Sequence, residues 1–157
     1  RQGAGSNGSL RGFGQRFLMR ITLWVEPVAA SRPRVARNGR VYYQKRYDNF
    51  RKLAWASLGE MSRPKGCPLS CPLEVEITFY CRTPKNPSNP YPIGDIDNYQ
   101  KGLLDVLNGW AWQDDVQVCR IIASKKYSDT PRIEVEIREH HVEPIRIRKT
   151  RKLPEVR

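Results

Sequence analysis

The sequence predicts a single α+β domain in which helices pack on one mixed β-sheet, in the order strand, hairpin, helix, strand, helix, strand, strand. Three observations support this fold class. The chain has 157 residues, which is enough for one domain with a hydrophobic core and too few to expect two. Two segments repeat apolar residues at helical intervals, and four others have the alternation and composition of strands. Stretches rich in glycine and proline separate these segments.

The N-terminal third predicts an extension, a strand and a hairpin. Residues 1–18 are rich in glycine and lack periodicity, so we expect a flexible extension. Met19–Val25 is rich in β-branched and aromatic residues and predicts a strand that ends at Glu26-Pro27. In "ASRPRVARNGRVYYQKR", Asn38-Gly39 separates two short β-prone runs, which is typical of a hairpin turn.

The centre of the chain predicts a helix and a strand. Arg46–Met61 places apolar residues at intervals of three and four, so it predicts an amphipathic helix. Leu73–Arg82, "LEVEITFYCR", alternates as a strand does. The loop that follows contains four prolines within 84–92 and cannot be regular.

The last elements are a helix and two strands. Asp97–Leu107 has an apolar stripe at helical spacing and ends at Asn108-Gly109, as a helix with a C-cap does. Residues 116–128 and 132–139 then predict a pair of antiparallel strands. We therefore place the domain at 19–140 and a basic tail at 141–157.

The charge distribution points to a polyanionic partner. The formal net charge is +12, and from Arg1 to Glu60 there are 12 basic against 3 acidic residues. Nucleic acid is the commonest polyanion that such a surface binds. A basic surface without a specific partner is the simpler alternative.

The four cysteines and the hydropathy pattern indicate a cytoplasmic protein. The chain has no signal-peptide pattern, so we expect reduced thiols rather than disulfides. Cys67 and Cys71 have a spacing that could start a zinc site, but no second close pair follows. No apolar run approaches the roughly 20 residues that span a bilayer, so we expect no membrane association.

Five aspartates lie within residues 94–118, "GDIDNYQKGLLDVLNGWAWQDDVQV". On a helix that begins near Asp97, residues 97, 101 and 105 are successive neighbours along one edge. Asp95 precedes the helix, and we expect the short connection to fold Asp114 and Asp115 back toward it. Individually these side chains could cap helices, form surface ion pairs or decorate a turn. Because clustered carboxylates repel each other, the set is better explained by a bound cation.

The donor chemistry favours Mg²⁺, with Mn²⁺ as an alternative. A calcium loop starting at Asp95 is excluded, because Gln100 stands where a glycine is needed and Val106 where a bidentate Glu is needed. Hard oxygen donors without His or Cys favour Mg²⁺ or Mn²⁺ over zinc. Metal held by Asp95, Asp97 and Asp115 would activate a water next to a DNA phosphate. Lys101 would donate a hydrogen bond to a phosphate oxygen in the transition state.

The same stretch resembles the signature of the RusA family of Holliday-junction resolvases. The family shares D-x-D-N, a lysine three residues after the Asn, a further helical aspartate, and an aromatic turn leading to D-D. Here these are Asp95, Asp97, Asn98, Lys101, Asp105, Asp114 and Asp115.

The resemblance implies a RusA-like fold and a small homodimeric, Mg²⁺-dependent endonuclease that nicks four-way DNA junctions symmetrically in recombination and repair, in a bacterial or phage-infected cell. By position, Asp95, Asp97 and Asp115 would bind the metal, with Asp114 as a supporting carboxylate. Lys101 would be the catalytic lysine. The resemblance implies no small-molecule cofactor.

The basic hairpin segment is the predicted DNA contact. It interleaves cations with Tyr42 and Tyr43, a composition suited to phosphate contacts with occasional base stacking. The predicted DNA-binding residues are Arg32, Arg34, Arg37, Arg40, Lys45 and Arg46. For Trp110 and Trp112 we expect packing in the core or in a dimer rather than base contact.

Two other functions remain open from the residues alone. One is a non-enzymatic nucleic-acid-binding protein whose aspartates only cap and pair. The other is a nuclease that acts on other branched DNA or on RNA.

Overall fold

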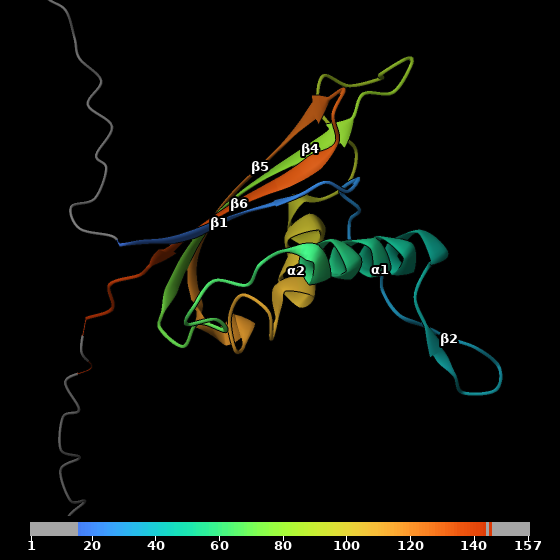
Figure 1. Ribbon diagram of the computed structural model, residues 1–157. Helices are drawn as coiled ribbons and strands as arrows, with labels where there is room; N and C mark the ends of the chain where they lie inside the picture. Colours follow the sequence, from blue (N-terminus) through green and yellow to red (C-terminus); the bar gives the residue numbers. More distant parts are fainter. Residues whose placement is uncertain (1–15, 144, 146–157) are drawn as a thin grey trace, which may run out of the picture.

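The computed structural model describes residues 16–143 and 145, which form one α+β domain (Figure 1). In chain order the elements are β1 (Phe17–Leu23), β2 (Arg34–Val35), β3 (Val41–Tyr42), α1 (Lys45–Glu60), β4 (Leu73–Arg82), α2 (Ile96–Leu107), the 3-10 helix η1 (Asp115–Gln117), β5 (Val118–Ser128) and β6 (Arg132–Glu139). This order and the mixed sheet confirm the predicted fold class.

The main sheet has four strands in the order β1-β6-β4-β5. β6 lies antiparallel to both β1 and β4, whereas β4 and β5 are parallel. β2 and β3 form a separate two-stranded hairpin that projects away from the sheet (Figure 1). Both α1 and α2 cover the same face of the main sheet (Figure 1).

The prediction that β5 and β6 pair with each other is wrong, because β4 lies between them. β4, α2 and β5 form a parallel β-α-β unit, which places β5 directly beside β4. β6 occupies the inner position, where Ile133, Val135 and Ile137 are fully buried. The alternation of a strand reports which side chains face the core, but it does not report which strand lies alongside.

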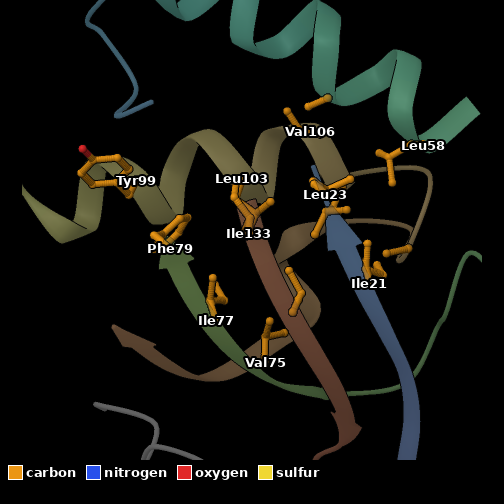
Figure 2. Close-up of a cluster of buried hydrophobic side chains, with 14 of the residues drawn as sticks. Ile21, Leu23, Leu58, Val75, Ile77, Phe79, Tyr99, Leu103, Val106 and Ile133 are labelled. Atoms are coloured by element: carbon orange, nitrogen blue, oxygen red, sulfur yellow. The ribbon is translucent and has the colours of Figure 1, made fainter. Parts of the chain in front are cut away.

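The core lies between the sheet and the two helices. Figure 2 shows Ile77 and Phe79 of β4 and Ile133 of β6 facing Tyr99 and Leu103 of α2. The rings of Phe79 and Tyr99 are 5.4 Å apart between centroids. Alternate residues of the strands and one face of each helix therefore supply a single apolar core.

The two helices pack closely because α2 has a glycine at the contact. A Cβ at Gly102 would lie 3.2 Å from the Tyr47 ring of α1 and 3.4 Å from the carbonyl oxygen of Val28. The Trp55 indole of α1 donates to the carbonyl of Val106 at 3.2 Å. These contacts hold α2 against α1 and against the chain that follows β1.

The sheet face opposite the helices is polar. Arg138 of β6 lies 3.0 Å from Glu76 and 2.5 Å from Glu136, and Arg120 lies 2.7 Å from the buried carboxylate of Glu74. Because each of these carboxylates has an arginine partner, this face is a network of ion pairs rather than a second apolar surface.

The observed boundaries differ by one or two residues from the predicted ones in four elements, and one of them is β5, which begins at Val118 and not at residue 116. β1 begins at Phe17 and ends at Leu23, because Leu23 pairs with Ile133 near the start of β6 and the next residues have no partner. α1 and α2 each begin one residue earlier than predicted, at Lys45 and Ile96. Phe17 and Leu18 thus belong to the sheet, while most of the predicted extension and tail lies outside the described residues.

Neither helix of the described chain has both the length and the apolar composition that a membrane crossing requires. All four cysteines are free thiols. Trp112 is fully buried and donates to the side-chain oxygen of Asn108 at 2.8 Å, and Trp110 packs against the core. The expected packing role of these two tryptophans within the chain is confirmed.

Candidate active site

Asp95 and Asp97 are exposed together at the N-terminal end of α2. Asp95 occupies the N-cap position with extended backbone dihedrals, but its carboxylate makes no capping hydrogen bond. Asp97 lies in the first helical turn. The positive end of the helix dipole stabilises negative charge here. Neither carboxylate caps the helix through a hydrogen bond, so both remain available to a ligand.

The chain before α2 is held by Tyr99. Its hydroxyl donates to the carbonyl of Ile93 at 2.9 Å, and its ring packs against Gly94, where a Cβ would lie only 3.2 Å from the ring. Gly94 has φ +102°, a conformation that other residues rarely adopt. Burial raises the pKa of Tyr99, so the hydroxyl keeps its proton and remains a donor. The position of Asp95 is therefore set by a buried anchor.

Lys101 lies one turn after Asp97 on the same edge of α2, with its side chain exposed. Asp105 follows on that edge and accepts a hydrogen bond from Tyr47 of α1 at 3.4 Å. Burial, reinforced by the Asp105 charge, raises the pKa of Tyr47 to about 12, which keeps this donor protonated. Asp105 thus contacts α1, whereas Asp97 and Lys101 face solvent.

Asp114 and Asp115 lie at the other end of α2. The backbone amide of Gln113 donates to the carbonyl of Leu69 at 3.1 Å, and the Gln117 side chain donates to Leu69 and Cys71 at 3.0 Å. This segment therefore sits beside the chain that leads into β4. Asp114 caps η1 by accepting from the Val116 amide at 2.9 Å.

The connection leaves Asp114 and Asp115 at the C-terminal end of α2, so within one chain they do not converge with Asp95 and Asp97 as expected of a shared metal site. Because β4 and β5 are parallel, α2 runs in the opposite direction between them, and the residues before β5 emerge at the C-terminal end of α2. A helix of 12 residues is about 18 Å long. Within the described residues, no three His, Cys, Asp or Glu side chains gather closely enough to hold a metal ion.

Lys125 of β5 is a cation beside Asp95 that was not predicted. Its ammonium group donates to the carbonyl of Gly94 and lies 6.0 Å from the centroid of the Tyr91 ring. Lys125 is half-buried and follows Ile121 and Ala123 on the helix-facing side of β5. The period of two in this strand could have identified it, because it places a lysine on the apolar face.

The predicted DNA-binding cations lie in or next to the hairpin. Arg32 precedes β2, Arg34 lies on it and Lys45 opens α1, and all are exposed. Arg37 and Arg40 flank the turn, where Gly39 has φ +78° and the Arg40 amide donates to the Asn38 side chain at 3.1 Å. No ion pair with an acidic residue was found for these cations in the described part of the chain, so their charges remain available to a polyanion.

The three predicted metal-binding aspartates have the ligand atoms that a hard divalent cation prefers. The carboxylates of Asp95, Asp97 and Asp115 are free of hydrogen bonds and ion pairs to other described residues, and carboxylate oxygens are the preferred ligands of Mg²⁺. The N-terminal end of α2 supplies two of the three carboxylates in one chain. The third lies at the opposite end of that helix.

Comparison with known proteins agrees with the motif. Residues 25–138 match the model of the family described as endodeoxyribonuclease RusA. The chain is also similar to an uncharacterized protein of Bacillus subtilis (strain 168), YqaN, with 34% identity over 137 residues, covering 77% of this chain and 96% of that protein. The family match includes the β2–β3 hairpin, both α-helices, β4, β5 and all but the last residue of β6. It also includes the whole aspartate-rich segment.

The match extends over most of the described domain, and the fold exposes Asp95 at the N-cap of α2 and Asp97 and Lys101 on the helix itself. The chain belongs to the RusA family of endodeoxyribonucleases.

Proposed function

We propose that this chain is a divalent-metal-dependent endonuclease that resolves Holliday junctions by paired symmetric nicks and acts in DNA recombination and repair in the cytoplasm. The observation that carries the proposal is the exposure of Asp95 at the N-cap of α2, and of Asp97 and Lys101 along one edge of that helix, in a chain of the RusA family. The ion is Mg²⁺, with Mn²⁺ as the alternative, because the donors are carboxylates.

Asp95, Asp97 and Asp115 would hold the ion, and Asp114 would support Asp115 from the adjacent position. A bound divalent ion supplies an activated water and neutralises charge on the phosphate. Lys101 directs an ammonium group from the next helical turn to a phosphate oxygen, where it stabilises the charge that develops in the transition state.

A homodimer would supply the carboxylate that a single chain does not bring to the start of α2. Asp115 lies about one helix length from Asp95, since α2 has 12 residues and separates them. We propose that Asp115 of a second copy lies beside Asp95 and Asp97, so that two equivalent sites form across a two-fold axis. Such a pair matches the approximate two-fold symmetry of a four-way junction.

The hairpin would grip the junction arms. Arg32, Arg34, Arg37 and Arg40 are exposed around β2 and β3, and Lys45 and Arg46 continue the basic surface into α1. Contacts of this kind bind phosphate without reading sequence. They would position the junction so that its strands pass the N-terminal end of α2.

The test is incubation of the protein with a labelled four-way junction and with a matched linear duplex, with Mg²⁺ and with a chelator. The proposal expects paired nicks in the junction only with Mg²⁺ and little cutting of the duplex. Junction binding without nicking would instead support a non-enzymatic binding protein. Equal cutting of flaps, forks or RNA would redirect the proposal to another branched substrate.

A further inference from the structure

A cleft of about 530 Å³ opens beside the N-terminal end of α2. Its walls come from the chain after β1, the start of α1, the end of β4 and the loop before α2, and they include Glu26, Arg46, Tyr47, Arg82, Tyr99 and Tyr127. The proposed function gives no role to this cleft. Its volume lies within the range of sites that bind small organic groups.

The walls of the cleft suit a flat ring. Tyr127 of β5, which is half-buried, lines the cleft together with Pro84 and Pro92, whereas Tyr47 and Tyr99 are buried and expose only 2% and 8% of their surface. Aromatic side chains of this kind stack on nucleobases whatever the base, because every base has a π face. The surface is therefore suited to an unstacked base rather than to a charged phosphate alone.

Glu26 provides a hydrogen-bond acceptor in this cleft that is only partly used. One carboxylate oxygen accepts from the backbone amide of Arg82 at 3.1 Å. The other oxygen is buried and has no hydrogen-bond partner among the described residues. The Arg82 side chain forms an ion pair with it at 3.7 Å, which is too long for a hydrogen bond. A buried acceptor of this kind is normally satisfied, so a ligand that displaces the exposed Arg82 side chain and donates a hydrogen bond would complete it.

The cleft adjoins both parts of the proposed DNA site. Gly94 lines it and directly precedes Asp95, and its carbonyl accepts from Lys125. Arg46 lines it from the first turn of α1, which follows the basic hairpin. A strand that ran from the hairpin to the carboxylates would pass the mouth of the cleft.

We propose that this cleft receives one unstacked nucleobase of the bound junction, next to the phosphate that is cut, and that Glu26 accepts a hydrogen bond from the exocyclic amino group of that base. Cytosine, adenine and guanine carry such a group and thymine does not. Bases near a branch point are easier to unstack than bases within a duplex, because their pairing and stacking are already incomplete. The inference rests on the proposed function and deepens it by naming a base-binding subsite.

The test compares wild type with Glu26→Gln, which keeps an oxygen for the Arg82 amide but replaces the unpartnered oxygen with an NH₂ group that cannot accept a hydrogen bond. The dissociation constant for an intact four-way junction is measured in chelator, and the junction is checked on a gel for cutting. We expect Glu26→Gln to weaken binding about tenfold, as loss of a hydrogen bond to a charged acceptor does. Glu60→Gln, an exposed position at the far end of α1, is the matched control and should bind as wild type does.

The position of the base is found by substitution. One nucleotide at a time through the branch point is replaced by an abasic residue or by thymine, with its complement changed to match. When the substituted nucleotide is the one that enters the cleft, the dissociation constants of Glu26→Gln and wild type should become about equal. At every other substituted position the tenfold difference between these two constants should persist. Ala29→Phe, which adds a ring to the wall of the cleft, should show the same pattern, while circular dichroism confirms that both variants fold.

Each result decides the matter. The inference is overturned if Glu26→Gln and wild type bind the unmodified junction with about the same dissociation constant. It is also overturned if the tenfold difference between their dissociation constants persists at every substituted position. If the wild-type protein binds and cuts the junction in either case, the proposed function stands and only the base-binding subsite is lost. If wild type does not prefer the junction over duplex, both fail together.

Discussion

Lys101 and Asp97 lie one helical turn apart on the solvent-facing edge of α2, and neither side chain is engaged by the rest of the described chain. A fold gains nothing from an exposed carboxylate and an exposed lysine at these positions beyond a weak interaction of an i, i+4 pair. Their proposed roles are therefore separable from stability. Substitutions here should affect chemistry and leave folding intact.

Lys101→Ala and Asp97→Asn should each lower the rate of junction nicking by about 10²–10³-fold, because each removes one stabilising group from the transition state. Junction binding in chelator should stay close to that of wild type. Single-turnover nicking and a binding titration measure the two effects. Asp129→Asn, an exposed aspartate in the β5–β6 turn, serves as the control. Parallel loss of binding and nicking would indicate a folding defect instead.

Lys125 acts on the site through the backbone. Its ammonium group donates to the carbonyl of Gly94, the residue before Asp95, so it positions the start of α2 rather than touching substrate. Lys125→Met retains the aliphatic chain and loses the donor. We expect nicking to fall about tenfold, as loss of a charged hydrogen bond does, and the Mg²⁺ concentration for half-maximal rate to rise.

The control for this change is its neighbour in the strand. Lys126→Met alters a lysine on the other face of β5, where the ammonium group lies over the Tyr80 ring, and should nick as wild type does. Lys125→Arg should restore much of the activity because it restores a donor. If Lys125→Met has the Mg²⁺ dependence of wild type, Lys125 has no positioning role.

At the scale of elements, the proposed DNA binding belongs to the hairpin and the proposed catalysis to α2. β2 and β3 have only two residues each and both strands are exposed, so the hairpin presents cations to solvent and adds nothing to the core. α2, by contrast, buries one face and exposes the other. Binding and chemistry should therefore respond to different elements.

Arg34→Ala should weaken binding of junction and duplex to a similar degree and reduce the slope of log affinity against log salt by about one unit, since one phosphate contact is lost. Binding titrations at several salt concentrations measure this slope. Lys65→Ala, an exposed cation in the loop after α1, is the charge-matched control. An unchanged slope would remove Arg34 from the DNA contacts.

At the scale of the whole molecule, the arrangement of β4, α2 and β5 separates the three carboxylates proposed to bind the metal. The parallel crossover sends Asp95 and Asp97 to one end of α2 and Asp115 to the other. A homodimer that pairs the two ends would gather all three carboxylates twice. Catalysis would then depend on assembly and not only on folding.

Mixing two inactive variants tests this arrangement. Asp97→Asn and Asp115→Asn should each be inactive alone, whereas mixed dimers should regain nicking, because one of their two sites would have all its carboxylates. At most half of the dimers are mixed and each cuts one strand, so we expect single nicks at about a quarter of the wild-type rate or less. If the mixture stays as inactive as its components under conditions that exchange subunits, the shared site is wrong.

Local pattern was enough to predict most elements. The strand Leu73–Arg82 and the strand 132–139 have the predicted bounds, because alternation, flanking turns and burial agree along them. The closely spaced motif residues between Asp95 and Asp115 also predicted the family, which the family match confirms. The predicted pairing of β5 with β6 was wrong, because the periodicity of a strand contains no information about its neighbours. The crossover connection from β4 through α2 determines that β5 lies beside β4.

The sequence by itself determined the order of elements, the basic hairpin and the carboxylates available for a metal, since these depend on residue type and short-range spacing. Only the tertiary structure decided that α2 separates Asp115 from Asp95 and Asp97, that Lys125 reaches the carbonyl of Gly94, and that Glu26 faces a cleft beside them. The physical reason is that these relations join residues far apart in the chain, and packing of the sheet against its helices sets them.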